Sequence, residues 1–150
     1  MTPDEILSRL RRFLLVFTVL LFGGAVTELW LVNHKEDPVQ LIPFALCALG
    51  AAAALAALVR PRRATLWLLR VCMALVVLGT LLGIYLHVEG NVAFQREIDP
   101  SAPAADLWLG ALGGANPLLA PGILSVAAVL ALAATYRHPA LTDSSDRRSG

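Results

Sequence analysis

Two short histidine and glutamate pairs carry the chemistry that this sequence could support. Each pair places a histidine two residues before a glutamate, first at His34 and Glu36 and again at His87 and Glu89. Glu28 adds a third carboxylate within an apolar run that precedes the first pair. Imidazole and carboxylate groups are ligands for zinc, iron or manganese, and facing helices build such sites in helical bundles. These five residues are therefore candidate metal ligands, and transport or metal handling is the function that such a site would support.

The spacing within each pair argues against a metal site. Helical metal motifs place their ligands three or four residues apart, so that both side chains lie on one face of the helix. We therefore predict ordinary solvated or hydrogen-bonded side chains, with no metal and no other cofactor. Ligation of a haem by His34 and His87 is a weaker alternative, because it requires histidines within helices that face an apolar slot.

Two further charged residues lie inside apolar runs, where a charge is costly and usually marks a function. Glu28 is a candidate for proton transfer or ion coordination, unless it reaches water at the outer interface, and Arg96 is its candidate partner. Arg70 follows Arg63 by seven residues, so its guanidinium can extend toward the cytoplasmic interface. The sequence offers Arg70 no acidic partner at the same depth, which leaves a partner on another protein or a lipid phosphate as the alternative.

Four apolar runs must position these side chains. The 150 residues are 57% hydrophobic and only 15% charged, and the mean hydropathy is +0.70, which is too apolar for a soluble globular domain. About 20 apolar residues are enough to cross the hydrocarbon core of a bilayer. The sequence therefore predicts an all-α, four-helix transmembrane bundle in one domain, residues 1–138, with spans near residues 13–32, 39–59, 64–86 and 118–136.

Basic residues are segregated to one side of these runs. Only Lys35 and Arg96 fall in the two connections expected outside, whereas the inner segments hold Arg9, Arg11, Arg12, Arg60, Arg62, Arg63, Arg137, Arg147 and Arg148. Cytoplasmic segments retain an excess of Lys and Arg, so we predict a multi-pass protein of the plasma membrane with both termini in the cytoplasm. Residues 139–150 then form a polar cytoplasmic tail. Cleavage of the first run as a signal peptide near Ala25 is an alternative, but the apolar pattern continues through Trp30.

The connection between the third and fourth runs is long and is expected to be ordered. It has about 30 residues, and structureless loops of that length are uncommon. Within it, the sequence DLWLGAL at residues 106–112 predicts a short interfacial helix, with Asp106 near its start and Trp108 among the lipid headgroups. We therefore predict an extracytoplasmic lid over the outer end of the bundle.

Small residues inside the runs indicate close helix packing. Gly79 and Gly83 have the spacing of a close helix contact, and we expect a partner within the same chain in preference to dimerisation. Cys47 and Cys72 both lie deep in apolar runs, where we interpret them as packing residues and not as a redox pair.

The sequence has no recognisable catalytic machinery. It contains no nucleophile elbow, P-loop or zinc-protease helix, and no basic patch interleaved with aromatics that would indicate nucleic-acid binding. We assign no catalytic residue and leave open whether the chain is an enzyme, while favouring that it is not. The preferred function is an accessory subunit or partner-binding scaffold of a larger envelope complex, in contact with lipid and with protein partners. Transport or metal handling comes second, and an enzyme acting on a lipid or quinone third.

Four stretches of the chain carry a resemblance to a known group of proteins. They are ELWLVNHKEDPVQLIPF, HVEGNVAFQREIDP, GANPLLAPG and TYRHP, and they extend over residues 28–139. Together they resemble an uncharacterised family of small bacterial four-span integral membrane proteins. The resemblance implies that the outer face recurs in that family, but it brings no activity, cofactor or catalytic residue.

Overall fold

The chain folds into helices, as predicted. The computed structural model describes residues 1–114 and 121–142, and this part of the chain contains no strand. Its helical elements are α1 (Pro3–Leu31), the 3-10 helix η1 (Pro38–Leu41), α2 (Ile42–Val59), α3 (Arg63–Ile98), α4 (Ala104–Leu112), α5 (Gly122–Ala134) and α6 (Pro139–Thr142).

Three helical segments are long and apolar enough to cross a membrane. They are Pro3–Leu31, Pro38–Val59 and Arg63–Ile98. Within the most apolar 18-residue stretch of each, the buried share is only 22%, 28% and 22%, so most of their apolar surface faces outward. This pattern is compatible with a multi-pass membrane protein. Residues 118–120 of the predicted fourth span lie outside the described part, and α5 within the rest of that span has 13 residues, or about 20 Å.

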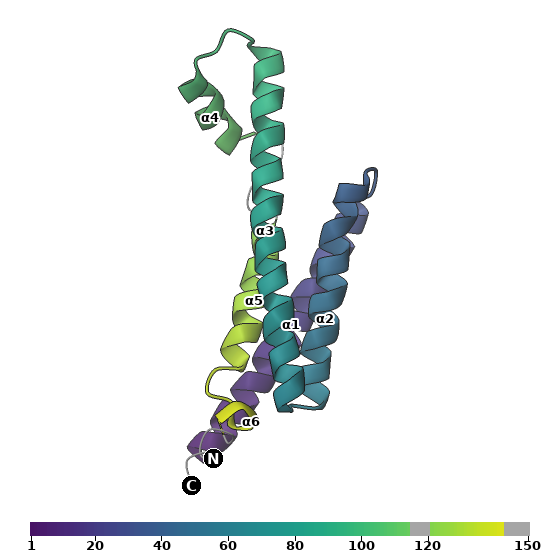
Figure 1. The fold of residues 1–150 in the computed structure, drawn as a ribbon, viewed down its shortest axis with the longest axis vertical. Coiled ribbons are helices and arrows are strands. Elements are labelled where there is room, and N and C mark those ends of the chain that lie inside the picture. The colour runs from purple at the N-terminus through teal and green to yellow at the C-terminus, as the bar shows by residue number, and fades with distance from the viewer. Residues whose placement is uncertain (115–120, 143–150) are drawn as a thin grey trace.

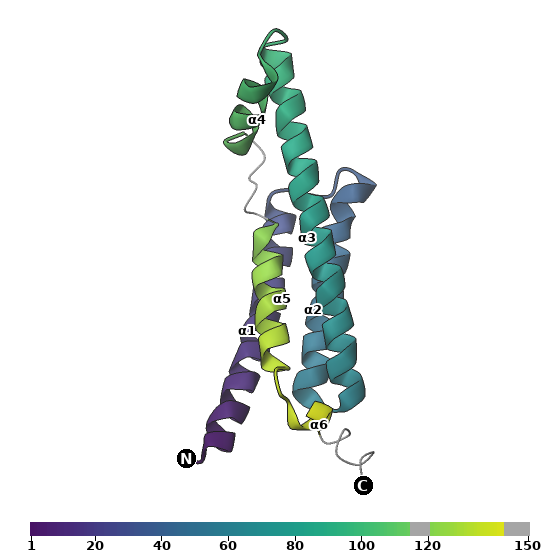
Figure 2. The ribbon, with the colours of Figure 1, turned by 60° about the vertical axis from the view of Figure 1, so that its left-hand side comes forward.

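Four helices, α1, α2, α3 and α5, pack side by side. α1 contacts α2 and α5, and α3 contacts the same two helices, so α1 and α3 lie on opposite sides of the group (Figures 1 and 2). The buried residues of α2 and α5 are mostly alanines, which let the backbones approach closely. Larger buried side chains come from the other two helices, namely Phe22, Leu66, Leu69, Met73 and Val76.

The two ends of this helix group carry different residues. The start of α1, the α2–α3 turn and α6 lie together at one end, which we call the arginine end (Figure 1). The turn is fixed there by Thr65, whose hydroxyl donates to the carbonyl of Arg60 at 2.6 Å and accepts from the N–H of Arg62 at 3.0 Å. η1 lies at the opposite end, which we call the η1 end (Figure 1).

The connection after α3 differs from the prediction. The helix does not stop near residue 86 but continues to Ile98, so part of the expected loop is helical. At 36 residues, α3 is about 54 Å long, well beyond the ~30 Å of bilayer hydrocarbon. The helix continues because residues 87–98 contain no proline, and it ends just before Asp99 and Pro100, since a proline disfavours helical backbone in the preceding residue.

The predicted short helix is present as α4, but the predicted lid is not confirmed. α4 lies beside the part of α3 that extends past the η1 end (Figures 1 and 2). The buried side chain of Asn91 joins the two helices by donating from Nδ2 to the carbonyl of Ala111 at 2.9 Å. Asp106 lies in the first turn of α4 and does not cap it. We call α3 from His87 onward, together with α4, the α3–α4 extension.

The first residues of the predicted polar tail are helical. Residues 139–142 form α6, and Ala140 and Leu141 pack against the core. Residues 143–150, including the predicted cytoplasmic Arg147 and Arg148, lie outside the described part of the chain.

Candidate functional site

A pocket of about 510 Å³ opens at the η1 end, between α1, η1, α2, α3 and α5. Its volume lies within the range of about 300–1,000 Å³ that is typical of ligand sites. Small residues line part of the space, namely Ala25, Gly79 and Gly83. The remaining wall is mainly aliphatic and includes Leu29, Ile42, Leu46, Leu82, Leu86 and Leu124.

The predicted packing glycines of α3 lie beside this pocket. A Cβ atom at Gly79 would overlap Cδ1 of Leu46 on α2, and one at Gly83 would lie 3.3 Å from Cβ of Pro121, just before α5. Both glycines therefore allow a close approach within the chain. They also place α3 so that its next turns form one wall of the pocket.

His34 reaches the pocket through the turn that ends α1. Asn33 has a left-handed backbone, with a φ of 54°. The N–H of Asn33 donates to the carbonyl of Trp30 at 3.2 Å, and the N–H of His34 donates to the carbonyl of Leu29 at 2.9 Å. This is the Schellman arrangement of a helix C-terminus, in which asparagine is tolerated at the left-handed position. The reversal it produces directs His34 into the pocket.

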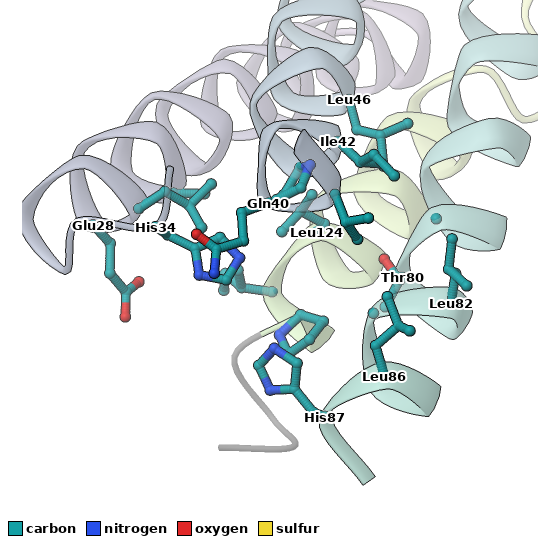
Figure 3. A pocket seen from close by; sticks show the side chains of 18 of the residues that line it. Glu28, His34, Gln40, Ile42, Leu46, Thr80, Leu82, Leu86, His87 and Leu124 are labelled. Carbon is teal, nitrogen blue, oxygen red and sulfur yellow. The ribbon is translucent and has the colours of Figure 1, made fainter. Parts of the chain in front are cut away.

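Glu36 and Gln40 continue the same polar turn. Asn33 donates from Nδ2 to Oε1 of Glu36 at 3.0 Å, and the N–H of Glu36 donates to Oε1 of Gln40 at 2.8 Å. Gln40 lines the pocket beside His34 (Figure 3). Sequence reasoning assigned no role to Gln40, although its position in the first helical turn after Pro38 was a usable signal.

The two predicted histidines come together at this pocket. His34 follows α1 and His87 lies on α3, and both side chains extend into the same space (Figure 3). The pKa of His34 is lowered from its ordinary value, first because the imidazole is partly buried and second because of the nearby charge of His87. Both effects disfavour protonation, so His34 is held in its neutral form.

The predicted glutamates do not converge with the histidines. Glu28 lines the pocket, but it is exposed and its carboxylate lies apart from both imidazole rings (Figure 3). Glu89 follows His87 by two residues on a continuous helix, which turns it about 200° away. Arg96, the candidate partner of Glu28, lies about 13 Å farther along α3 than His87.

The five candidate metal ligands are therefore not assembled into one site. Among residues 1–114 and 121–142, no three His, Cys, Asp or Glu side chains form a group that could hold a metal ion. His34 also lies in a turn and not within a helix, which was the condition for haem ligation by His34 and His87. The arrangement instead offers an apolar space with imidazole and amide groups at its mouth.

Arg70 belongs to the other end of the helix group and has a neutral partner. It donates from Nε to the hydroxyl of Thr135 at 2.9 Å and from Nη2 to the carbonyl of Thr135 at 3.3 Å. Arg11 approaches the same turn from α1 and donates to the carbonyls of Tyr136 and Arg137 at 3.1 and 3.0 Å. Arg70 therefore caps the C-terminal end of α5 within the chain. A side chain that snorkels to the cytoplasmic interface, and a partner on another protein or a lipid phosphate, stay predictions.

Comparisons with protein-family models, curated proteins and solved structures find no match to this chain. The resemblance to small bacterial four-span proteins stays a prediction, and the function must be argued from the geometry.

Proposed function

We propose that this chain is a non-catalytic integral protein of the bacterial plasma membrane that serves as an accessory subunit or partner-binding scaffold. It crosses the membrane four times, with α5 as the described part of the fourth span. The arginine end faces the cytoplasm and the η1 end faces outward. The outward-facing apolar surface of three long helices and the segregation of arginine support this arrangement.

The main support for the partner-binding role is the exposed apolar face of α4. Trp108, Leu109 and Leu112 are 58%, 68% and 64% exposed. Their spacing of one, three and four residues places them on one face of the helix. The opposite face packs on α3 through the buried Leu107 and Ala111. α4 is thus apolar on both faces, although α3 covers only one of them.

The height of this face above the bilayer favours a protein partner over lipid. Gly110 approaches Gln95 closely, since a Cβ atom there would lie 3.3 Å from its Cδ. Gln95 follows His87 by eight residues, which is about 12 Å along the helix. If the hydrocarbon ends near His87, a headgroup layer of about 5–8 Å does not reach the level of Gln95. It does reach Ala111, which is bonded to Asn91 about 6 Å beyond His87, so the end of the apolar face near Trp108 and Leu109 is the part that lies above the headgroups. Apolar side chains held in water form a surface that a partner would cover.

The α3–α4 extension is also preorganised for binding. Asn91 is only 1% exposed, and its bond to Ala111 is therefore shielded from water. Gly114 lies so close that a Cβ atom there would overlap the Asn91 side chain. A surface that is rigid before binding loses less conformational entropy when the partner docks.

The test is photo-crosslinking of the full-length chain in its native membrane. A photoreactive amino acid at Leu109 should form adducts with a distinct protein, whereas the same group at Leu78, an exposed residue in the apolar part of α3, should not. A Trp108→Ser variant should abolish the adduct, whereas Tyr136→Ser, at the arginine end, should leave it unchanged. Recovery of a monomer alone in mild detergent, without adducts at residue 109, would count against this function.

Metal handling has less support, because the five candidate ligands are not brought together.

A further inference from the structure

The pocket at the η1 end is mainly apolar in its inner part, and its polar side chains lie at its mouth. Ala25, Thr80 and Leu124 are buried residues that line it. The hydroxyl of Thr80 donates to the carbonyl of Val76 within its own helix at 3.0 Å, so its proton is already used. The inner part of the pocket therefore suits an aliphatic or isoprenoid group, whose burial there is favourable.

The mouth presents hydrogen-bond donors. Oε1 of Gln40 accepts from the N–H of Glu36. The NH₂ group of the same amide is a donor that can face a ligand. His34 lines the same space and, in its neutral form, carries one N–H donor (Figure 3). Oxygen acceptors on a ligand would complement this set.

The charges around the mouth favour a neutral ligand. Burial and His87 both keep His34 in its neutral form. The carboxylate of Glu28 lies apart from the imidazole rings, so it does not balance a cation placed between them (Figure 3). Because His34 is held neutral, it would not compensate an anion that leaves water, and this transfer would be costly.

We propose that this pocket binds a neutral amphipathic molecule whose carbonyl head group accepts hydrogen bonds from His34 and Gln40. The apolar body of the ligand lies deeper, against Ala25 and Leu124. A glycerol ester from the membrane and a quinone share this chemistry, and the experiment separates them. This binding site goes beyond the partner-binding role and does not depend on it.

The experiment is thermal unfolding of the purified full-length protein in a maltoside detergent, which carries no carbonyl group. The probes are mono-olein, a benzoquinone with one isoprenoid unit, and oleate as an anion with the same acyl chain as mono-olein. At a hundredfold excess over Kd, a bound probe should raise Tm by about 5–10 °C. Stabilisation by mono-olein identifies an ester ligand, and stabilisation by the quinone identifies a quinone. An equal effect of oleate, or no effect of either neutral probe, overturns the proposal.

Matched variants locate the effect in this pocket. Ala25→Phe fills the space and should abolish the shift, whereas Gly24→Phe should keep it, because a Cβ atom at Gly24 meets nothing within 4 Å. His34→Leu removes one donor and should weaken binding about tenfold. If Ala25→Phe does not fold, the His34→Leu, Gln40→Leu double variant makes the same test at positions outside the core. A shift that survives in the double variant overturns the proposal.

Discussion

The guanidinium of Arg70 donates to both the hydroxyl and the carbonyl of Thr135, so that an arginine of α3 closes the C-terminal end of α5. The last carbonyls of a helix have no partner within it, and its C-terminus carries a partial negative charge. Arg70 satisfies both needs with one side chain. Its guanidinium also lies 5.3 Å from the ring centroid of Trp67, within the range of a cation–π contact.

The bonds of Arg70 should contribute measurably to stability. We expect Arg70→Met to lower the free energy of unfolding by about 1.5–3 kcal/mol, because hydrogen bonds from a charged group are lost in a partly buried place. Arg70→Lys should recover only part of this loss, since an ammonium cannot reproduce the two-pronged geometry. Arg12→Met, at an exposed position of the same end, is the control. Equal stability of the Arg12 and Arg70 variants in denaturant titrations would show that this cap does not contribute to the free energy of unfolding.

The role of Arg70 could not be predicted from the sequence. Its partner is a hydroxyl and a carbonyl, which carry no charge signal, and Thr135 follows 65 residues later. The packing of α5 against α3 decides the contact. Conversely, the start of the second apolar segment was predictable, because Pro38 fits a first helical turn, where a missing N–H costs no hydrogen bond. Pro43 likewise lies in the first turn of α2, which begins anew after η1.

The length of α3 was predicted wrongly for a physical reason. Hydropathy falls at His87, but backbone hydrogen bonds continue through polar residues as readily as through apolar ones. The signal for the true end was present in Asp99 and Pro100. His87 and Glu89 both lie within α3, where helical geometry turns Glu89 away from His87. His34 and His87 come together because α1, α2 and α3 pack against one another. This packing cannot be predicted from the spacing of residues along the chain.

The α3–α4 extension should open when Asn91 is replaced. Asn91→Leu leaves the carbonyl of Ala111 buried without this donor, which costs about 1–3 kcal/mol. Hydrogen exchange of residues 104–112 should therefore accelerate, whereas exchange in α1 and α2 should not change. Phe94→Leu, on an exposed part of the same helix, serves as the control. If the amides of α4 exchange at the same rate in all three proteins, the Asn91 bond does not hold the extension together.

Two histidines at opposite ends should titrate independently below their ordinary range. The pKa of His34 is lowered by burial and by His87, and the pKa of His138 is lowered by burial and by the charge of Arg11. His87→Gln should raise the pKa of His34 only, and Arg11→Met should raise that of His138 only. NMR titration of labelled histidine measures both. A shift of both histidines in either variant would contradict these separate causes.

The lowered pKa values also set a direction for stability. Between the folded pKa and about 6.5, the unfolded chain binds more protons than the folded protein. Stability should therefore fall as the pH drops below about 6.5, and the fall should end once the pH passes below the folded pKa values. A chain in which His34 and His138 are both replaced by Gln should lose this part of the pH dependence in denaturant titrations.

The proposed orientation predicts which loops a membrane-impermeant thiol reagent reaches in intact cells. Cys47 and Cys72 are free and buried, and are replaced by Ala beforehand. Glu36→Cys, at the η1 end, should then react from outside, whereas Arg62→Cys, in the α2–α3 turn, should react only after the membrane is opened. The reverse pattern would invert the orientation and place the pocket on the cytoplasmic side.

Close packing at Gly79 should tolerate one added methyl group better than a larger side chain. A Cβ atom there meets Cδ1 of Leu46, the mobile end of a side chain, so Gly79→Ala requires only that this leucine move. Gly79→Leu must instead separate α2 from α3, and overpacking of this kind costs about 1–3 kcal/mol. Gly23→Leu is the matched control, because a Cβ atom at Gly23 meets nothing within 4 Å. Denaturant titration should rank the variants in that order, and a Gly79→Leu protein as stable as Gly23→Leu would mean that α2 and α3 do not pack closely at this turn.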